Sequence, residues 1–119
     1  LQAEGARICL CSNTWSDQCR TVLTRLGIAD YFSFIVEAQG AKRKDHPEVF
    51  FECLHRLGGA DPALCVVGED AVYSARTAHQ AGFTVIGIQD AASAADAPEM
   101  EQVCDQFLPD WTALDWDRV

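Results

Sequence analysis

The sequence has 119 residues, of which 49% are hydrophobic and 23% are charged, a composition typical of one globular domain. This composition excludes a disordered or collagen-like chain, and the length excludes a second folded domain. Eighteen acidic and nine basic residues give a net charge of −9, which disfavours nucleic acid and anionic membranes as partners. No apolar run is long enough to cross a bilayer and no leader opens the chain, so we expect a soluble, cytoplasmic protein.

Six cysteines and a single methionine add two expectations. The cysteines lack the paired short spacing of a disulfide framework and lie mostly in apolar stretches, so we expect them to be reduced. The only methionine is Met100 and the sequence begins with Leu1, so we expect a fragment of a longer protein.

The first half of the chain predicts two strands, each followed by a helix. A strand over residues 8–11 is apolar throughout and ends in the polar turn 12–14. A helix over 16–26 follows, with an apolar stripe at helical spacing and a glycine after it. A second strand is predicted over 32–36, and a proline opens the next helix, which covers 47–57.

The second half continues the alternation. A strand over 64–67 is followed by a helix over 71–81, whose buried face consists of small residues. A strand over 83–88 follows, and the last helix covers 98–107, with an apolar stripe that ends at its last residue. Residues 109–119 show no period and are predicted to be coil with at most one short helix.

This alternation of strands and helices predicts an α/β fold with a parallel sheet covered on both faces. Right-handed crossovers place the carboxyl ends of all strands at one edge, where ligands bind in open α/β sheets. The polar residues that follow the strands are Ser12, Asn13, Glu37, Glu69, Asp70, Gln89 and Asp90.

Two features at this edge have both a functional and a structural interpretation. Glu69 and Asp70 are adjacent carboxylates after an apolar strand, suited to Mg²⁺, although a solvated acidic turn has the same sequence. Lys42-Arg43-Lys44 is the only basic cluster in an acidic chain and suits a phosphate, although it also suits a solubilising loop. Ser12 either donates to a phosphoryl oxygen or caps the helix that follows.

Three segments together resemble motifs of the haloacid dehalogenase superfamily. Ser12-Asn13-Thr14 follows an apolar strand, Lys44 lies six residues before Phe50, and Gly68-Glu69-Asp70 leads to Ala81-Gly82. In order and spacing they are similar to the second, third and fourth motifs of that superfamily. The run from Lys44 to Phe50, with an aspartate in place of the first proline, is similar to that of its phosphatase and phosphoglucomutase-like branch.

The resemblance implies a Rossmann-like core that performs Mg²⁺-dependent phosphoryl transfer on a small phosphorylated substrate. An aspartate attacks phosphorus and a second aspartate acts as acid and base. By the same resemblance, Ser12 and the Asn13 backbone bind the transferred phosphoryl group, and Lys44 neutralises charge on the nucleophile and the phosphate. Glu69 and Asp70 anchor the metal.

The sequence departs from the superfamily's pattern at two places. Ser74 stands where many members have a further acidic residue, a change that the mutase-like branch tolerates. The first motif, Asp-x-Asp-Gly-Thr, is absent. The resemblance implies that its strand lies in the middle of the sheet, between the strands at 8–11 and 64–67, and that the substrate-selecting cap follows it. We therefore expect residues 1–119 to be a partial core without a cap, inactive alone, that self-associates or binds the missing segment.

Two other functions stay open beside the phosphatase. A non-catalytic, flavodoxin-like binding or regulatory module has the same alternation of strands and helices. A phosphomutase differs in returning the phosphoryl group to a sugar instead of passing it to water.

Overall fold

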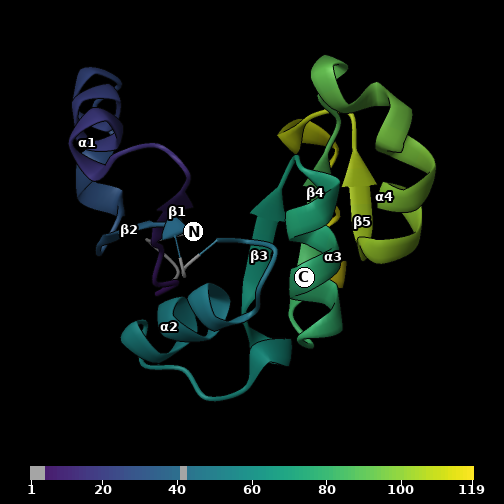
Figure 1. Ribbon diagram of the computed structural model, residues 1–119, viewed down its shortest axis with the longest axis horizontal. Helices are drawn as coiled ribbons and strands as arrows, with labels where there is room; N and C mark the ends of the chain where they lie inside the picture. The colour runs from purple at the N-terminus through teal and green to yellow at the C-terminus, as the bar shows by residue number, and fades with distance from the viewer. Residues whose placement is uncertain (1–4, 41–42) are drawn as a thin grey trace. The chain divides into compact units, whose positions relative to one another are not determined.

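The structure is a computed structural model that describes residues 5–40 and 43–119. It divides into two compact units, here called the N-terminal unit, up to Gly58, and the C-terminal unit, from Gly59 onward. Each unit contains parallel strands and helices that cover them (Figure 1). The α/β class with parallel strands is therefore confirmed.

The N-terminal unit contains a two-stranded parallel sheet and two helices. In chain order its elements are β1 (Leu10–Ser12), α1 (Ser16–Arg25), β2 (Ile35–Glu37) and α2 (Glu48–Arg56). Leu10 pairs with Ile35 and Ser12 with Glu37, so the two strands end together. The four predicted elements are all present, although both strands begin later and end one residue later than predicted.

The apolar stripes of the two helices form most of the core of this unit. Cys19 and Leu23 of α1 are buried, and so is Val36 of β2. From α2 the buried residues are Val49, Phe50, Cys53 and Leu54. Of the stripe predicted for α1, however, Val22 and Leu26 are exposed. Helical periodicity therefore predicted the buried face of α2 but only half of that of α1.

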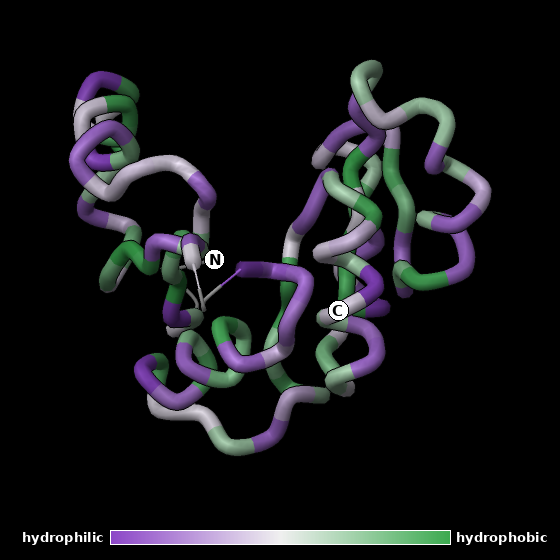
Figure 2. Tube along the Cα trace, viewed as in Figure 1, coloured by the Kyte–Doolittle hydropathy of each residue, from purple (hydrophilic) through white to green (hydrophobic). Residues whose placement is uncertain are grey.

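The C-terminal unit contains a three-stranded parallel sheet in the order β3-β4-β5. Its elements are β3 (Val66–Glu69), α3 (Val72–Gln80), β4 (Thr84–Ile88), α4 (Ala97–Val103) and β5 (Gln106–Leu108). Short 3-10 helices cover Pro62–Leu64, Ala91–Asp96, Trp111–Ala113 and Trp116–Arg118. The central strand β4 has the most buried residues, and its hydrophobic stretch can be followed in Figure 2.

The prediction of a helix over 98–107 is wrong at its carboxyl end. Helix α4 ends at Val103, and residues 106–108 form the third strand of the sheet. Asp105 makes this change of structure favourable, because its carboxylate accepts a hydrogen bond from the Val85 N–H at 2.7 Å and its own N–H donates to the Val85 carbonyl at 2.8 Å. Pairing with β4 decides the conformation here, and periodicity along the chain does not reveal it.

The tail after β5 is irregular with short helical turns, close to the predicted coil with a short helix. The Gln106 side chain holds it, donating to the Asp115 carbonyl at 3.0 Å and accepting from the Asp115 N–H at 2.9 Å. Among the residues that the structure describes, no helix has both the length and the apolar character needed to cross a membrane.

Candidate phosphoryl and metal site

Ser12 and Asn13 lie where β1 ends, held by hydrogen bonds from the segment after β2. The Ser12 carbonyl accepts from the Ala38 N–H at 2.7 Å, and the Asn13 carbonyl accepts from the Gln39 side chain at 2.7 Å. The Ser12 hydroxyl accepts from the Thr14 N–H at 3.1 Å, which fixes the oxygen and leaves its own proton available to a ligand. The helix-capping interpretation of Ser12 is therefore wrong, because its hydroxyl binds Thr14 in the turn before α1 and no hydrogen bond among the described residues joins it to the helix. Its role in binding a phosphoryl group stays a prediction.

Lys44 comes to the same strand end from the loop before α2. Its side chain is 9% exposed, and its ammonium Nζ lies 3.4 Å from the Cys11 carbonyl, to which it donates. In a parallel sheet, every second residue of a strand directs its backbone N–H and C=O toward the same neighbouring strand. In β1, Leu10 and Ser12 make these hydrogen bonds to the β2 segment. The Cys11 carbonyl therefore points to the other edge of β1, so the ammonium lies at that edge, one residue from Ser12.

The rest of the basic cluster behaves differently. Arg43 is exposed and its guanidinium lies 3.7 Å from the Asp45 carboxylate. Lys42 lies outside the described residues. A buried cation needs compensation by an anion or by dipoles, whereas an exposed one is stabilised by water. Lys44 is therefore the described member of the cluster that is buried at the end of β1, where the Cys11 carbonyl dipole compensates part of its charge.

Glu37, at the end of β2, links β2 to the start of α1. Its carboxylate accepts a hydrogen bond from the Ser16 N–H at 2.7 Å, at the start of α1. Hydrogen bonding from Ser16 lowers the pKa of Glu37. Helix α1 thus receives its amino-terminal cap from β2, because no side chain of its own caps it.

In the C-terminal unit, Glu69 is the last residue of β3 and Asp70 directly follows it, two residues before α3. The Trp111 ring packs against this strand at Gly68, where an added Cβ would lie 2.9 Å from the ring. Sequence reasoning missed this contact, since Trp111 belongs to a tail without periodicity. It places an aromatic ring against Gly68, the residue before the acidic pair.

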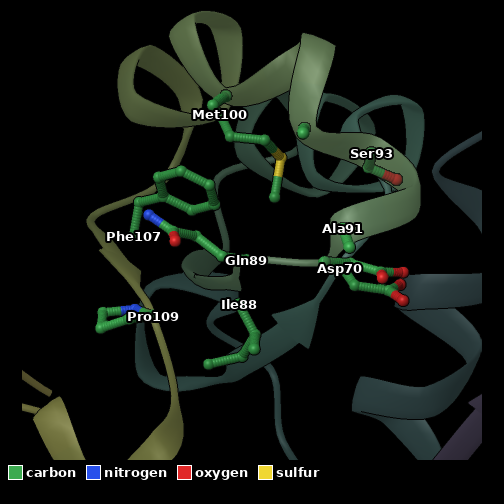
Figure 3. A pocket seen from close by; sticks show the side chains of 11 residues that line it. Asp70, Ile88, Gln89, Ala91, Ser93, Met100, Phe107 and Pro109 are labelled. Atoms are coloured by element: carbon green, nitrogen blue, oxygen red, sulfur yellow. The ribbon is translucent and has the colours of Figure 1, made fainter.

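A pocket of about 400 Å³ opens at the carboxyl ends of β3, β4 and β5. Residues from all three strand ends, from the 3-10 helix and from α4 line it, including Asp70, Ile88, Gln89, Met100, Phe107 and Pro109. Figure 3 shows the Asp70 carboxylate and the Phe107 ring on opposite sides of it. The predicted ligand-binding edge thus has a cavity in this unit, with one member of the acidic pair in its wall.

The donor set of the acidic pair fits Mg²⁺. This ion is usually bound by one or two carboxylates and completes its shell with water and substrate phosphate, so it needs no closed cage of side chains. Over residues 5–40 and 43–119, no three His, Cys, Asp or Glu side chains are grouped so as to hold a metal. Glu69 and Asp70 therefore fit a hydrated Mg²⁺ and not a fully enclosed structural ion. Ser74 is fully buried in α3 and adds no charge to this set.

In the N-terminal unit, Lys44 binds the carbonyl of Cys11, the residue before Ser12 and Asn13. In the C-terminal unit, Glu69 and Asp70 are consecutive residues at the end of β3. That the two groups form a single site stays a prediction. The hydrogen bonds from Lys44 to Cys11 and from Gln39 to Asn13 join residues 33 and 26 positions apart, so no local sequence signal could have found them.

Comparisons with known proteins agree with this description of the chain. A family model described as haloacid dehalogenase-like hydrolase matches residues 1–88. The fructose-1-phosphate phosphatase YqaB of Escherichia coli is 35% identical over 69 residues, which are 57% of this chain and 36% of that protein. An uncharacterized protein of Haemophilus influenzae is 36% identical over 69 residues, which are 57% of this chain and 34% of that protein.

Similarity to a solved structure extends over more of the chain. The crystal structure of a putative beta-phosphoglucomutase from Thermotoga maritima superposes with a TM-score of 0.74 and 25% identity. It covers 90% of this chain and 49% of that one. The matches thus span about a third of the curated relatives and about half of the solved chain. Because the family model matches well over half of the sequence, the chain belongs to the haloacid dehalogenase-like hydrolase family.

Proposed function

We propose that this chain is the partial core of a Mg²⁺-dependent phosphatase that acts on a small phosphorylated metabolite through an aspartyl-phosphate intermediate. The observation that carries the proposal is that Lys44, a nearly buried residue, donates to the Cys11 carbonyl, one residue before Ser12 at the end of β1. The similarity to a fructose-1-phosphate phosphatase makes sugar phosphates the first substrates to test.

In this proposal Ser12 and Asn13 bind the phosphoryl group. The Ser12 hydroxyl donates to one phosphoryl oxygen, and the Asn13 N–H donates to another. Lys44 supplies a positive charge that is poorly screened because the side chain is buried. It lowers the energy of the transition state by balancing the charge that gathers on the nucleophile and phosphate.

Glu69 and Asp70 would hold the Mg²⁺ ion. When bound, the ion neutralises negative charge on the phosphoryl oxygens. The two carboxylates balance the charge of the ion and fix its place relative to the end of β3. Asp70 also lines the pocket of the C-terminal unit, so it borders on space that a substrate could occupy.

The nucleophile is proposed to come from outside residues 1–119, because the sequence contains no Asp-x-Asp-Gly-Thr segment. Covalent catalysis without its nucleophile leaves only positioning and charge, so we expect the chain alone to be inactive. Each of β1 and β3 is paired on one side by β2 or β4 within its own unit. Their other edges are the proposed place for the missing strand or for association with a second copy. We also propose a cytoplasmic location, in keeping with six cysteines that form no disulfide.

The test is a phosphate-release assay with the protein that contains these residues, on a panel of phosphate monoesters with and without Mg²⁺. Lys44→Ala is expected to lower kcat/KM by about 10²-fold or more, in line with the loss of one electrostatic stabiliser of a transition state. Arg43→Ala is the matched control, because it removes a neighbouring positive charge that is exposed and paired with Asp45. It should retain nearly full activity. Unchanged turnover in Lys44→Ala, or equal losses in both variants, would contradict the proposed role.

A phosphomutase is the second candidate, favoured by the similarity to the putative beta-phosphoglucomutase. The product decides between the two, since a phosphatase releases inorganic phosphate and a mutase forms an isomeric sugar phosphate. A non-catalytic binding module would bind its ligand without either product. Calorimetric titration of the complete protein with Mg²⁺ and fluoroberyllate, a phosphoryl mimic, supports the catalytic proposals if the mimic binds only with Mg²⁺.

A further inference from the structure

Three thiols gather between β1 and α2 in the N-terminal unit. Cys9 and Cys11 are two residues apart, so their side chains lie on the same face of the strand. Cys53, on α2, is buried and its thiol makes hydrogen bonds with both. None of the three is joined in a disulfide, so the structure shows the reduced form of the group.

The two strand cysteines differ in how firmly their backbone is fixed. Cys11 lies inside the paired part of β1, and its carbonyl accepts the hydrogen bond from Lys44. Cys9 precedes the strand and is half-buried. A disulfide needs a specific geometry, with Cβ atoms about 3.5–4.5 Å apart. The neighbours of Cys9 are also paired, since the Ile8 carbonyl accepts from the Ser33 N–H at 2.7 Å. The difference is that the Cys11 carbonyl holds Lys44, so a shift at Cys9 leaves that hydrogen bond in place.

The ionisation of Cys53 decides which thiol reacts first. The hydrogen bond with Cys11 lowers the pKa of Cys53, but the hydrogen bond with Cys9, burial and the negative charges of Cys9 and Glu52 outweigh it and raise the pKa to about 12. Cys53 is therefore a thiol at neutral pH and a poor nucleophile. The first attack on an oxidant falls to one of the two half-buried thiols, and we assign it to Cys9 because the Cys11 backbone holds Lys44.

We propose that Cys9 and Cys53 form an oxidation site in which a small disulfide such as oxidised glutathione joins β1 to α2 covalently. The Cys9 thiolate attacks one sulfur of the small disulfide, which forms a mixed disulfide and releases one glutathione thiolate. Cys53 gives up its proton and attacks the Cys9 sulfur, which forms the Cys9–Cys53 bond and releases the second glutathione. The two cysteines lose two electrons and the small disulfide gains them.

This bond would tie the beginning of β1 to the helix that follows Lys44. Within the same strand, Cys11 supplies the carbonyl that anchors Lys44, and Ser12 follows it. Oxidation therefore acts on the segment that carries the proposed phosphoryl-binding residues. The inference itself does not rest on the phosphatase proposal, because the bond can be detected without any activity.

The test is to incubate the full chain with oxidised glutathione, alkylate the remaining thiols, digest with trypsin without reduction and identify linked peptides by mass spectrometry. Trypsin releases Cys53 alone in the peptide 45–56, whereas 8–20 carries Cys9, Cys11 and Cys19. We expect 8–20 linked to 45–56, with fragment ions that place the bond at Cys9. The oxidised chain should also melt at a higher temperature than the reduced chain.

Variants distinguish this pair from random oxidation. Cys19→Ser is the matched control, since Cys19 is a buried cysteine of the same unit and lies in the same peptide. It should keep the link, Cys11→Ser should keep it too, and Cys53→Ser should lose it. The wild-type result stands even if a variant fails to fold. A folded wild-type chain without the link, a bond at Cys11 or Cys19, or the same mixture of pairs as in urea-unfolded chain overturns the proposal.

Discussion

Replacing Gly87 with alanine tests the packing of the C-terminal unit around β4. Gly87 is buried in the middle strand of the sheet, and a Cβ built there would lie 2.6 Å from the Cys104 sulfur. It would also lie 2.9 Å from Met100 Cε and 3.0 Å from Phe107 Cδ1. The φ angle of Gly87 is not positive, so any cost comes from packing and not from backbone strain.

The size of the effect follows from these distances. Carbon atoms in contact prefer about 3.5–4.0 Å, so these neighbours have to withdraw by about 0.5–0.9 Å. Overpacking of this kind costs about 1–3 kcal/mol. Alanine also lowers the conformational entropy of the unfolded chain, which stabilises the folded state by about 0.4–1 kcal/mol. We therefore expect a net loss of about 1–2 kcal/mol, or roughly 4–16 °C in Tm for a unit of this size.

The assay is thermal unfolding followed by circular dichroism, with Gly68→Ala as the control. At Gly68 the added Cβ would also meet a side chain at 2.9 Å, but this is the Trp111 ring, which is 53% exposed and can move outward. The control should lose less. Cys104→Ala in the Gly87→Ala background removes the nearest atom and should restore part of the loss. An unchanged Tm in Gly87→Ala, or equal losses at both glycines, would refute the reasoning.

Two further predictions concern polar groups of α3. Ser74 is fully buried and its hydroxyl has no hydrogen-bond partner among the described residues, so Ser74→Ala should raise the free energy of unfolding by about 1 kcal/mol. The Thr77 hydroxyl donates to a backbone carbonyl at 2.9 Å, so Thr77→Ala should raise the free energy of unfolding by less in the same urea titration. Arg76 makes a hydrogen bond to Glu99 at 2.5 Å that lowers the pKa of that carboxyl. A lowered folded-state pKa contributes stability above the unfolded value of about 4.5 that is lost as pH falls below it. The Tm difference between wild type and Glu99→Gln should therefore be present at pH 7 and shrink as the pH falls below 4.5, and a constant difference would contradict the ion pair's contribution.

The strands and helices of this chain were predictable from the sequence because each depends on neighbouring residues. Four apolar runs became β1 to β4, and four stripes became α1 to α4. The polar residues at the ends of β1 and β3 were recognisable as site candidates for the same reason, because they come directly after apolar runs. The family resemblance rested on the same local segments and was confirmed.

The tertiary structure decided what depends on contacts far along the chain. Phe107 continues the helical stripe of α4, yet it lies in β5, because hydrogen bonds between Asp105 and Val85 are worth more than further helical turns. Lys44 and Arg43 are adjacent basic residues that the sequence alone does not distinguish. In the folded chain Lys44 is buried against the end of β1, whereas Arg43 is exposed. The contact of Trp111 with Gly68 and the grouping of Cys9, Cys11 and Cys53 have the same origin. Local periodicity records which face of an element is buried, whereas the identity of the neighbours on that face is set when distant elements pack together.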